Sequence, residues 1–284
     1  MIDIHAHIYP PTIPTESIPA LMQRAKAAGL ASIVSVPETL VDARAVLRLS
    51  ISYPNFLFAC AGIHPAQPLR DEDGATIGVR SAVEADLEGL FDFMEENLGR
   101  LVGMGEVGLD FTPQVIQSPH NPPRLATADD VKTEQRKVLA RQVKFAIQHG
   151  LPLNVHSRSA GHHAISLLEE LGATKVVLHA FDGQIKYVRK AVALGYYFSV
   201  PTSAVRIPQQ QAIAEEVPLE QLLLESDTPA LAPEKGVSNV PSNLVVAAQE
   251  IARVKNVDLE TVISQTTRNA YKLFPKIEPH RPAI

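Results

Sequence analysis

The sequence predicts a closed (β/α)8 barrel, in which eight parallel strands are surrounded by helices. Short segments rich in β-branched residues alternate from end to end with longer segments whose apolar residues recur at three- and four-residue spacing. Eight such pairs fit the roughly 250 residues that this barrel usually needs. No G-x-G-x-x-G motif follows the first predicted strand, so an open dinucleotide-binding sheet is disfavoured.

Eight short β-rich runs are the predicted strands. Because helical segments separate them, we expect the strands to pair in parallel. In chain order they are Ile2–His5, Ser32–Val36, Phe56–Ile63, Leu101–Glu106, Leu153–His156, Lys175–His179, Tyr196–Val200 and Leu222–Glu225.

The predicted helices carry apolar residues on one face among charged residues, as helices that cover a sheet should. The longest has clear ends, because Thr127 and Asp130 resemble a capping box and His149-Gly150 is typical of a C-terminus. The helices around the sheet are Ile18–Ala28, Ala43–Ser50, Val83–Asn97, Asp130–His149, Ala164–Leu171, Ile185–Leu194 and Gln209–Glu216, and the outer layer is completed by Leu244–Arg253 and Leu259–Leu273.

Two long segments have no periodicity and are predicted to be loops. Ala66–Val79 follows the third strand and Thr112–Ala126 follows the fourth. Both lie at the carboxyl ends of the strands, where barrel enzymes place their sites. No internal repeat or linker is visible, so we expect a single barrel domain over residues 1–275 and a C-terminal tail over residues 276–284.

Composition limits the class of protein. The chain has 284 residues, of which 45% are hydrophobic and 20% charged, which excludes a disordered or disulfide-stapled protein. The net charge of −5 excludes a general basic coat for DNA, although an acidic enzyme can act on phosphates through a few arginines and bound cations. With Cys60 as the single cysteine and no signal peptide or membrane-spanning run, we expect an intracellular protein, cytoplasmic or nuclear.

Metal-ligating side chains recur at the carboxyl ends of five predicted strands. His5 and His7 are two residues apart, so an extended strand projects them to the same side. Four imidazoles and two carboxylates are too many for one tetrahedral zinc with an open position, and they suit two divalent cations bridged by a carboxylate. The complete set is His5, His7, Glu106, His156, His179 and Asp227.

A two-cation site predicts hydrolysis, because such a pair lowers the pKa of a bridging water and neutralises charge that develops on a phosphoryl or carbonyl oxygen. Magnesium, manganese and zinc all remain candidates. The predicted roles are bridging by Glu106, binding of one cation by His5 and His7 and of the other by His156 and His179, and cation binding together with orientation or deprotonation of the attacking water by Asp227.

Arg158 and His64 are predicted to bind the substrate. Arg158 lies two residues beyond His156 and offers a planar fork of donors that matches phosphate, although it could instead pair with Asp182. His64 ends the third strand and would face the cavity rim, unless it only bonds a backbone carbonyl. A phosphate-containing substrate is therefore favoured over a neutral amide.

Other polar residues are given lesser roles. Asp3 and Glu225 would orient imidazoles from positions deeper in the barrel. His162-His163 is expected to face solvent, because ligands there would duplicate a complete set. A solvated surface is also expected for the basic run that Glu134 interrupts, namely Lys132, Arg136, Lys137, Arg141 and Lys144.

The motifs around these residues resemble the TatD family of metal-dependent hydrolases, in order and over nearly the whole chain. Within the family, Glu106–Phe111, Val155–Gly161 and Leu178–Gly183 are most similar to the eukaryotic branch called TatD domain-containing protein 3. The motifs that carry the resemblance are His5-Ala6-His7, Gly62-Ile63-His64-Pro65, Gly105-Glu106-Val107-Gly108-Leu109-Asp110, Asn154-Val155-His156-Ser157-Arg158, His179-Ala180-Phe181-Asp182-Gly183, Glu225-Ser226-Asp227-Thr228-Pro229 and Thr267-Arg268-Asn269-Ala270.

The resemblance implies a TIM barrel with two divalent cations held by the six residues named above. It also implies 3′-exonuclease or related deoxyribonuclease activity on DNA, with cleavage at abasic sites within its range. The chain departs from many family members at Ala66, Ala180 and Asp182. These positions lie at the rim, where residues meet the substrate, and the ligand set is untouched.

Two alternatives stay open. An amidohydrolase-like barrel could open a C–N or ester bond, but its common bridging lysine is missing, since Glu106 stands there and no lysine lies between Val102 and Asp130. A barrel without catalysis could serve as a binding protein, but loss of catalysis usually breaks the ligand set, and all six residues are present.

Overall fold

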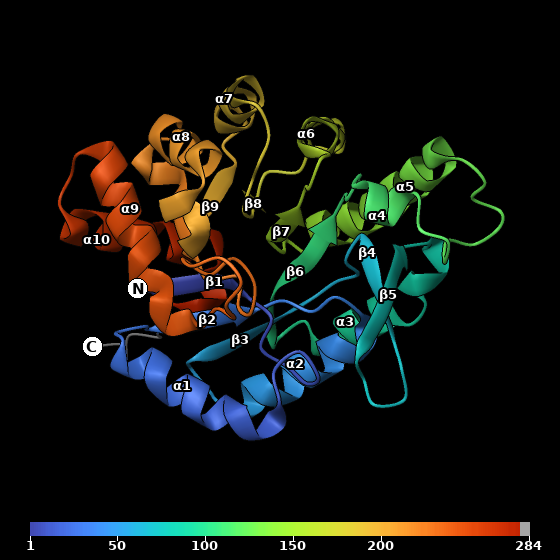
Figure 1. Cartoon of the computed structure of the whole chain (residues 1–284), viewed down its shortest axis with the longest axis horizontal. Helices are drawn as coiled ribbons and strands as arrows, with labels where there is room; N and C mark the ends of the chain where they lie inside the picture. Colours follow the sequence, from blue (N-terminus) through green and yellow to red (C-terminus); the bar gives the residue numbers. More distant parts are fainter. Residues whose placement is uncertain (279–284) are drawn as a thin grey trace.

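The computed structural model describes residues 1–278, and these form the predicted barrel (Figure 1). Eight strands pair in parallel in the order β1-β2-β3-β6-β7-β8-β9-β10. The predicted fold class is confirmed. The strands are β1 (Ile2–Ala6), β2 (Ser32–Ser35), β3 (Leu57–Ala61), β6 (Leu101–Gly108), β7 (Leu153–His156), β8 (Val176–Leu178), β9 (Tyr197–Pro201) and β10 (Leu222–Glu225).

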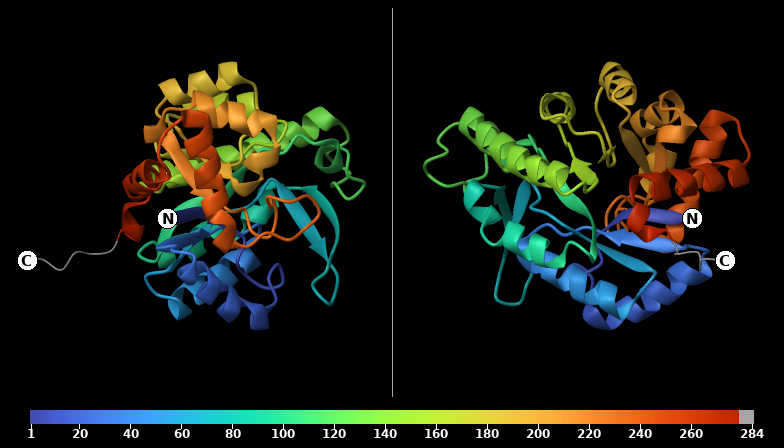
Figure 2. Two further views of the ribbon diagram at one scale, coloured as in Figure 1. Left: turned by 60° about the vertical axis from the view of Figure 1, so that its left-hand side comes forward. Right: turned by 180° about the vertical axis from the view of Figure 1, so that it is seen from behind.

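The first and last strands of the barrel meet just beyond their carboxyl ends. The backbone N–H of Asp227 donates to the carbonyl of His5 at 2.9 Å, and that of His7 donates to Thr228 at 2.8 Å. Figure 2 shows the N-terminal strand beside the C-terminal helices, and α10 packs against β1. The two ends of the chain therefore contribute side chains to the same end of the barrel.

Helices form the outer layer, each with its apolar side toward the strands. In the last one, Val262, Ala270 and Leu273 are buried at helical spacing. The main helices are α1 (Ile18–Ala27), α2 (Leu40–Ser52), α3 (Leu90–Asn97), α5 (Ala128–Gln148), α6 (Gly161–Glu170), α7 (Ile185–Ala193), α8 (Pro208–Glu216), α9 (Leu244–Lys255) and α10 (Leu259–Leu273).

The structure corrects one predicted helix, Val83–Asn97. Residues 84–87 form a separate 3-10 helix, and α3 starts only at Leu90. Gly89 between them has a φ of 71°, a left-handed conformation that an α-helix cannot include and that glycine adopts at little cost. The apolar spacing continues across this break, which is why the two helices were predicted as one.

The predicted loop Ala66–Val79 is also wrong, because most of it is an antiparallel hairpin. Strands β4 (Ala66–Arg70) and β5 (Thr76–Ser81) pair with each other and with no strand of the barrel among the described residues. Asp71 closes the turn by accepting hydrogen bonds from the backbone N–H of Asp73 and Ala75 at 3.1 and 2.8 Å. The proline at position 68 hid the strand pattern in the sequence.

The second predicted loop holds a single short helix, α4 (Pro113–Ile116), which packs against β5. At the other end of the chain, the predicted tail begins with packed residues. Ile277 is buried in a 3-10 helix over Pro275–Ile277, and residues 279–284 of the predicted tail lie outside the described residues. Among residues 1–278, none of the helices combines the length and apolar character needed to cross a membrane.

Candidate metal centre

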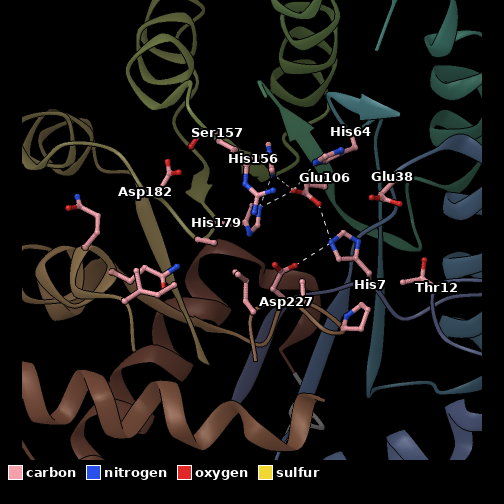
Figure 3. A pocket seen from close by; sticks show the side chains of 18 residues that line it. His7, Thr12, Glu38, His64, Glu106, His156, Ser157, His179, Asp182 and Asp227 are labelled. Carbon is pink, nitrogen blue, oxygen red and sulfur yellow. Dashed lines mark hydrogen bonds and ion pairs between the residues drawn. The ribbon is translucent and has the colours of Figure 1, made fainter. Parts of the chain in front are cut away.

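Strand β1 brings two imidazoles to the carboxyl end of the barrel. His5 Nε2 and His7 Nε2 lie 3.5 and 3.3 Å from Oε2 of Glu106, which is part of β6. The same two nitrogens lie 3.5 and 3.4 Å from Oδ1 of Asp227, just beyond β10. Figure 3 shows His7, Glu106 and Asp227 converging on one space.

The other oxygen of Glu106 faces a second pair of imidazoles. His156 Nδ1 and His179 Nε2 each lie 2.9 Å from Oε1 of Glu106. The ring of His179 also stacks on that of His5, with centroids 3.9 Å apart. Each oxygen of one buried carboxylate thus faces its own group of nitrogens, and the structure brings the six residues predicted as ligands together.

The donor set fits a divalent cation. Within the described part of the chain, three groups have ligand atoms within 4.8 Å of one another: His5, His179 and Glu225; His5, His7 and Glu106; His64, Glu106 and His156. Imidazole nitrogen and carboxylate oxygen are the ligands that zinc and manganese share. Two buried atoms in this region, His179 Nδ1 and Glu225 Oε1, have no hydrogen-bond partner, so donor capacity remains available.

Charge keeps the central carboxylate ionised despite its burial. Glu106 is only 2% exposed, and burial alone raises its pKa, but the surrounding imidazoles, led by His64, His179 and His5, bring the pKa well below its usual range. The reverse applies to His5, where burial lowers the pKa and the carboxylates of Glu106 and Asp227 raise it well above its usual value. The centre therefore combines anionic carboxylate oxygens with imidazoles that contact them.

Asp227 adopts an unusual backbone conformation that aims its side chain. Its φ is 53°, a left-handed value that is uncommon for residues other than glycine and that clusters at functional sites. Burial raises the pKa of Asp227, but the contacts with His5 and His7 hold the pKa well below its usual range. The carboxylate is thus ionised and directed at the two imidazoles of β1.

Two residues that the sequence analysis passed over orient the imidazoles. Asn154 accepts a hydrogen bond at 2.9 Å from Nδ1 of His5, and its amide in turn donates to the carbonyl of Ile4 at 2.8 Å. Asp110 lies 3.3 Å from Nε2 of His156. Such contacts fix which ring nitrogen faces the centre. Position offered a signal for Asn154, which is two residues before His156 and so projects to the same side of β7.

The two deeper acidic residues behave differently from each other. Asp3 accepts hydrogen bonds from the backbone N–H of His5 and Ser226 at 3.2 and 3.0 Å, so it braces the backbone rather than orienting an imidazole as predicted. Burial raises the pKa of Asp3 to about 7. Glu225 does face an imidazole, with its Oε2 3.5 Å from Nδ1 of His179, and it also accepts a hydrogen bond from Ser199.

A cavity of about 550 Å³ opens above the centre. Figure 3 shows Asp182 and Glu38 on opposite sides of it. Arg158 lines the mouth and is exposed, and it makes no ion pair with Asp182 or any other described carboxylate. Ser157 also lines the cavity, and its buried hydroxyl has no hydrogen-bond partner. Sequence reasoning missed Ser157, whose only signal was its place beside His156.

His64 lies deeper than the predicted rim position. It is 8% exposed, its Nδ1 donates to the carbonyl of Ala66 at 2.8 Å, and its Nε2 lies 3.4 Å from Oε1 of Glu106. Burial lowers the pKa of His64, whereas Glu106 and the other negative groups raise it to about 9. His64 therefore bonds a backbone carbonyl through Nδ1 and at the same time faces Glu106 through Nε2.

Comparisons with known proteins agree with this architecture. The model of a family described as TatD related DNase matches residues 2–275. Deoxyribonuclease TATDN3 of Homo sapiens is 41% identical over 277 residues, which cover 98% of this chain and 95% of that protein. The 3'-5' ssDNA/RNA exonuclease TatD of Edwardsiella piscicida is 28% identical over 268 residues, which cover 90% of this chain and 93% of that protein.

A solved structure supports the same fold. The crystal structure of YJJV, a TatD homologue from Escherichia coli k12, superposes with a TM-score of 0.78. The match covers 97% of this chain and 98% of that chain, at 24% sequence identity. At that identity the likeness concerns the barrel and the order of its elements.

Proposed function

This chain belongs to the TatD related DNase family, and from that premise we propose that it is a metal-dependent phosphodiesterase that shortens single-stranded DNA from the 3′ end, with cleavage at abasic sites within its range. One observation carries the proposal, namely that the two oxygens of Glu106 face separate groups of imidazoles. The names of the human deoxyribonuclease and of the bacterial single-strand exonuclease support DNA as the substrate.

Each oxygen of Glu106 defines one proposed cation site. Oε2, together with His5, His7 and Asp227, would hold one divalent cation. Oε1, together with His156 and His179, would hold the other. Magnesium, manganese and zinc are the candidate ions, because this mixture of nitrogen and oxygen donors accepts all three.

When bound, the cations supply a water of lowered pKa and neutralise the charge that develops on the phosphoryl oxygens. Asp227 orients the attacking water or accepts its proton at a carboxylate oxygen, and its Oδ1 lies 3.5 and 3.4 Å from Nε2 of His5 and His7. Glu106 stays anionic and holds the two groups of imidazoles at fixed positions.

Three residues at the cavity would bind the phosphate. Arg158 has a free guanidinium at the mouth, which can donate two parallel hydrogen bonds to phosphate oxygens. The unpartnered hydroxyl of Ser157 can donate one more. His64, with Nδ1 bonded to Ala66, presents Nε2 toward the same space.

An intracellular location is part of the same proposal. Cys60 is buried and free, and unpaired thiols persist in reducing compartments. Opening of a C–N or ester bond is less well supported, because Glu106 occupies the end of β6 where that chemistry commonly uses a lysine.

The test is cleavage of DNA labelled at the 5′ end by protein stripped of metal and then supplied separately with magnesium, manganese or zinc. We expect stepwise shortening from the 3′ end only when a cation is present. The Asp227→Asn variant should fold and lose turnover, because it keeps the shape of the side chain and removes the charge that orients water.

The variant also controls for a contaminating nuclease. Wild-type turnover retained by Asp227→Asn would remove Asp227 from the mechanism. If none of the three cations produced cleavage of intact or abasic-site DNA while metal analysis still found about two ions per chain, the DNA substrate would be excluded and the cation sites retained.

A further inference from the structure

Helices α5, α6 and α7 are neighbours in the outer layer of the barrel (Figure 1). Helix α6 starts at Gly161, soon after His156 at the end of β7. The backbone N–H of Phe111, which follows β6, donates to the carbonyl of Arg158 at 3.1 Å. Lys132 and Arg136, in the second and third turns of α5, lie 5.8 and 5.3 Å from the centre of the Phe111 ring. Arg158 and Asp182, which line the cavity, lie within a few residues of the starts of α6 and α7. The starts of these helices therefore lie at the same end of the barrel as the cavity.

The N-terminal halves of these helices carry cationic and aromatic side chains, which together we call the α5–α6–α7 rim. Arg136 illustrates its packing, with the guanidinium 5.3 Å from the centre of the Phe111 ring and one nitrogen 3.3 Å from Nδ1 of His163. The members of the rim are Lys132, Arg136, His162, His163, Lys186 and Tyr187.

The rim contains a stacked pair of rings that reaches the surface. His162 is exposed, and its ring lies 5.0 Å from that of Tyr187 with an angle of 21° between the planes. The ring of the adjacent His163 lies 3.8 Å from that of His162, at an angle of 38° between the planes. The ammonium of Lys186 lies 4.8 Å from the centre of the Tyr187 ring. Flat rings beside cations are the elements with which proteins bind single-stranded nucleic acids.

The positive charges of the rim are less compensated than those further along α5. Lys137 and Arg141 each lie 3.7 Å from a glutamate, whereas Arg136 has no carboxylate partner among residues 1–278. Lys132 has only Asp129, at 3.5 Å, and that carboxylate is 92% exposed. Burial lowers the pKa of His163, and the charges of His162, Arg136 and Lys132 lower it further. Positive charge thus gathers beside the cavity in a chain of net charge −5.

We propose that the α5–α6–α7 rim binds the nucleotides of a single strand that extend beyond the cavity, with bases stacked on His162 and Tyr187 and phosphates paired with Arg136 and Lys132. The proposal rests on the phosphodiesterase function proposed above and defines its substrate as a strand several nucleotides long. It also divides the basic run, which the sequence analysis treated as one solvated surface, into two residues that face the strand and three that do not.

The test compares two substrates, a small diester and an oligodeoxythymidylate of about 12 nucleotides. Bis(p-nitrophenyl) phosphate is a small diester and has no further nucleotides that could extend onto the rim. For the Lys132→Gln, Arg136→Gln double variant and for His162→Ala, we expect the KM for the oligonucleotide to rise about tenfold, with the KM for the small diester unchanged. A Lys137→Gln, Lys144→Gln double variant loses the same charge from α5 and should keep both values.

Binding is measured separately from cleavage, by fluorescence anisotropy of the labelled oligonucleotide with protein that also carries Asp227→Asn. Each phosphate contact contributes about 0.7 to the slope of log affinity against log salt for a single strand, so the double rim variant should bind with a slope reduced by about 1.4. His162→Ala changes an exposed side chain and should bind weakly with an unchanged slope, because a base contact is lost.

The outcomes separate the two proposals. Rim variants that bind and cleave the oligonucleotide like the Lys137→Gln, Lys144→Gln control would overturn the rim and leave the phosphodiesterase intact. Weaker binding by the rim variants, together with no cleavage of either substrate by the wild type with any cation, would support the rim and overturn the phosphodiesterase. Equal affinity for a blunt duplex and a single strand would contradict stacking on His162 and Tyr187, because paired bases do not expose their faces.

Discussion

At the scale of single residues, Glu106 has the most constrained environment. A carboxylate as buried as this one would be neutral in apolar surroundings, and it is ionised here because imidazoles surround it. Those imidazoles are in turn oriented by Asn154 and Asp110. Replacing any one of these groups therefore changes the charge or direction of its neighbours, and effects of double substitutions should not be additive.

The phosphate contacts can be tested one side chain at a time. Arg158→Ala should raise the KM for single-stranded DNA about tenfold or more, because a charge-assisted hydrogen bond is worth roughly 1.5–3 kcal/mol. Ser157→Ala should raise it about fivefold, since a neutral hydrogen bond is worth about 1 kcal/mol. Steady-state kinetics with saturating cation measures both. Arg158→Lys keeps the charge and loses the planar fork, and it should lie between the wild type and Arg158→Ala.

Unchanged kinetics for Arg158→Ala would make Arg158 a structural residue.

The sequence could predict which residues converge, because strand ends and two-residue spacing determine where a side chain points. It placed Asn154 on the side of β7 that carries His156, but it did not specify the roles of Asn154, Asp110 and Ser157, which depend on ring orientation and on a hydroxyl without a hydrogen-bond partner. Their roles follow only once the atoms are placed.

At the scale of secondary structure, the strands and helices with strong patterns were predicted to within a few residues. The bounds of β7, β10 and α10 agree with the prediction, because each segment has one clear period and polar or proline-containing ends. The two wrong predictions, the helix Val83–Asn97 and the loop Ala66–Val79, lie where the spacing of apolar residues does not follow the backbone. Apolar spacing runs across Gly89 although the backbone turns there. The β4–β5 hairpin is built mostly from exposed and half-buried residues, and its buried residues, Gln67 and Ser81, are polar.

One glycine in β6 shows how closely these elements approach. A Cβ atom on Gly108 would lie 1.9 Å from the carbonyl oxygen of His156, and the φ of Gly108 is 153°. Gly108→Ala should therefore lower the free energy of unfolding by more than about 2 kcal/mol and displace β7. Denaturant unfolding measures the change. Gly99→Ala, where no atom lies within 4 Å of the added Cβ, is the matched control and should stay within about 0.5 kcal/mol of the wild type.

Equal stability of the two alanine variants would mean that β6 and β7 can separate without cost. That result would contradict the tight register in which Gly108 pairs with His156. It would also remove the geometric reason for Glu106 and His156 lying 2.9 Å apart.

At the scale of the whole molecule, the fold class and the family were both predicted correctly from the alternation of elements and the order of motifs. The buried apolar cluster continues from Ala6 to Val262, which supports the proposal that residues 1–275 form one domain. Closure of the barrel depends on contacts between β1 and β10, and no local pattern in the sequence specifies such a long-range pairing.

Stability should depend on pH through the buried histidines. Burial lowers the pKa values of His64 and His179, but nearby carboxylates raise both to about 9, above the unfolded value of about 6.5. The folded protein therefore keeps protons that the unfolded chain releases, and this contribution to stability is complete below pH 6.5 and lost as the pH rises toward 9. Urea unfolding of chelator-treated protein should show a falling free energy across this range.

The same urea unfolding measurements in saturating manganese should show the opposite pH dependence. Cations require neutral imidazoles, so their binding strengthens as the pH rises, and the free energy of unfolding should then increase across the same range. A flat profile in chelator would contradict the raised pKa values of His64 and His179. The buried Asp3 has a pKa raised by burial to about 7. The folded protein therefore holds a proton that the unfolded chain releases above about pH 4, and the free energy of unfolding falls further as the pH rises from about 4 to 7.

The meeting of β1 with β10 has a consequence for how the protein comes into existence on the ribosome. His5 and His7 are translated first, but Asp227 follows only after the last barrel strand, and its backbone must reach His5 to close the ring. A growing or prematurely terminated chain thus lacks the carboxylate that would direct water at a phosphate. The proposed hydrolytic centre is complete only when synthesis has passed β10, so a chain that ends before Asp227 lacks one of its carboxylates.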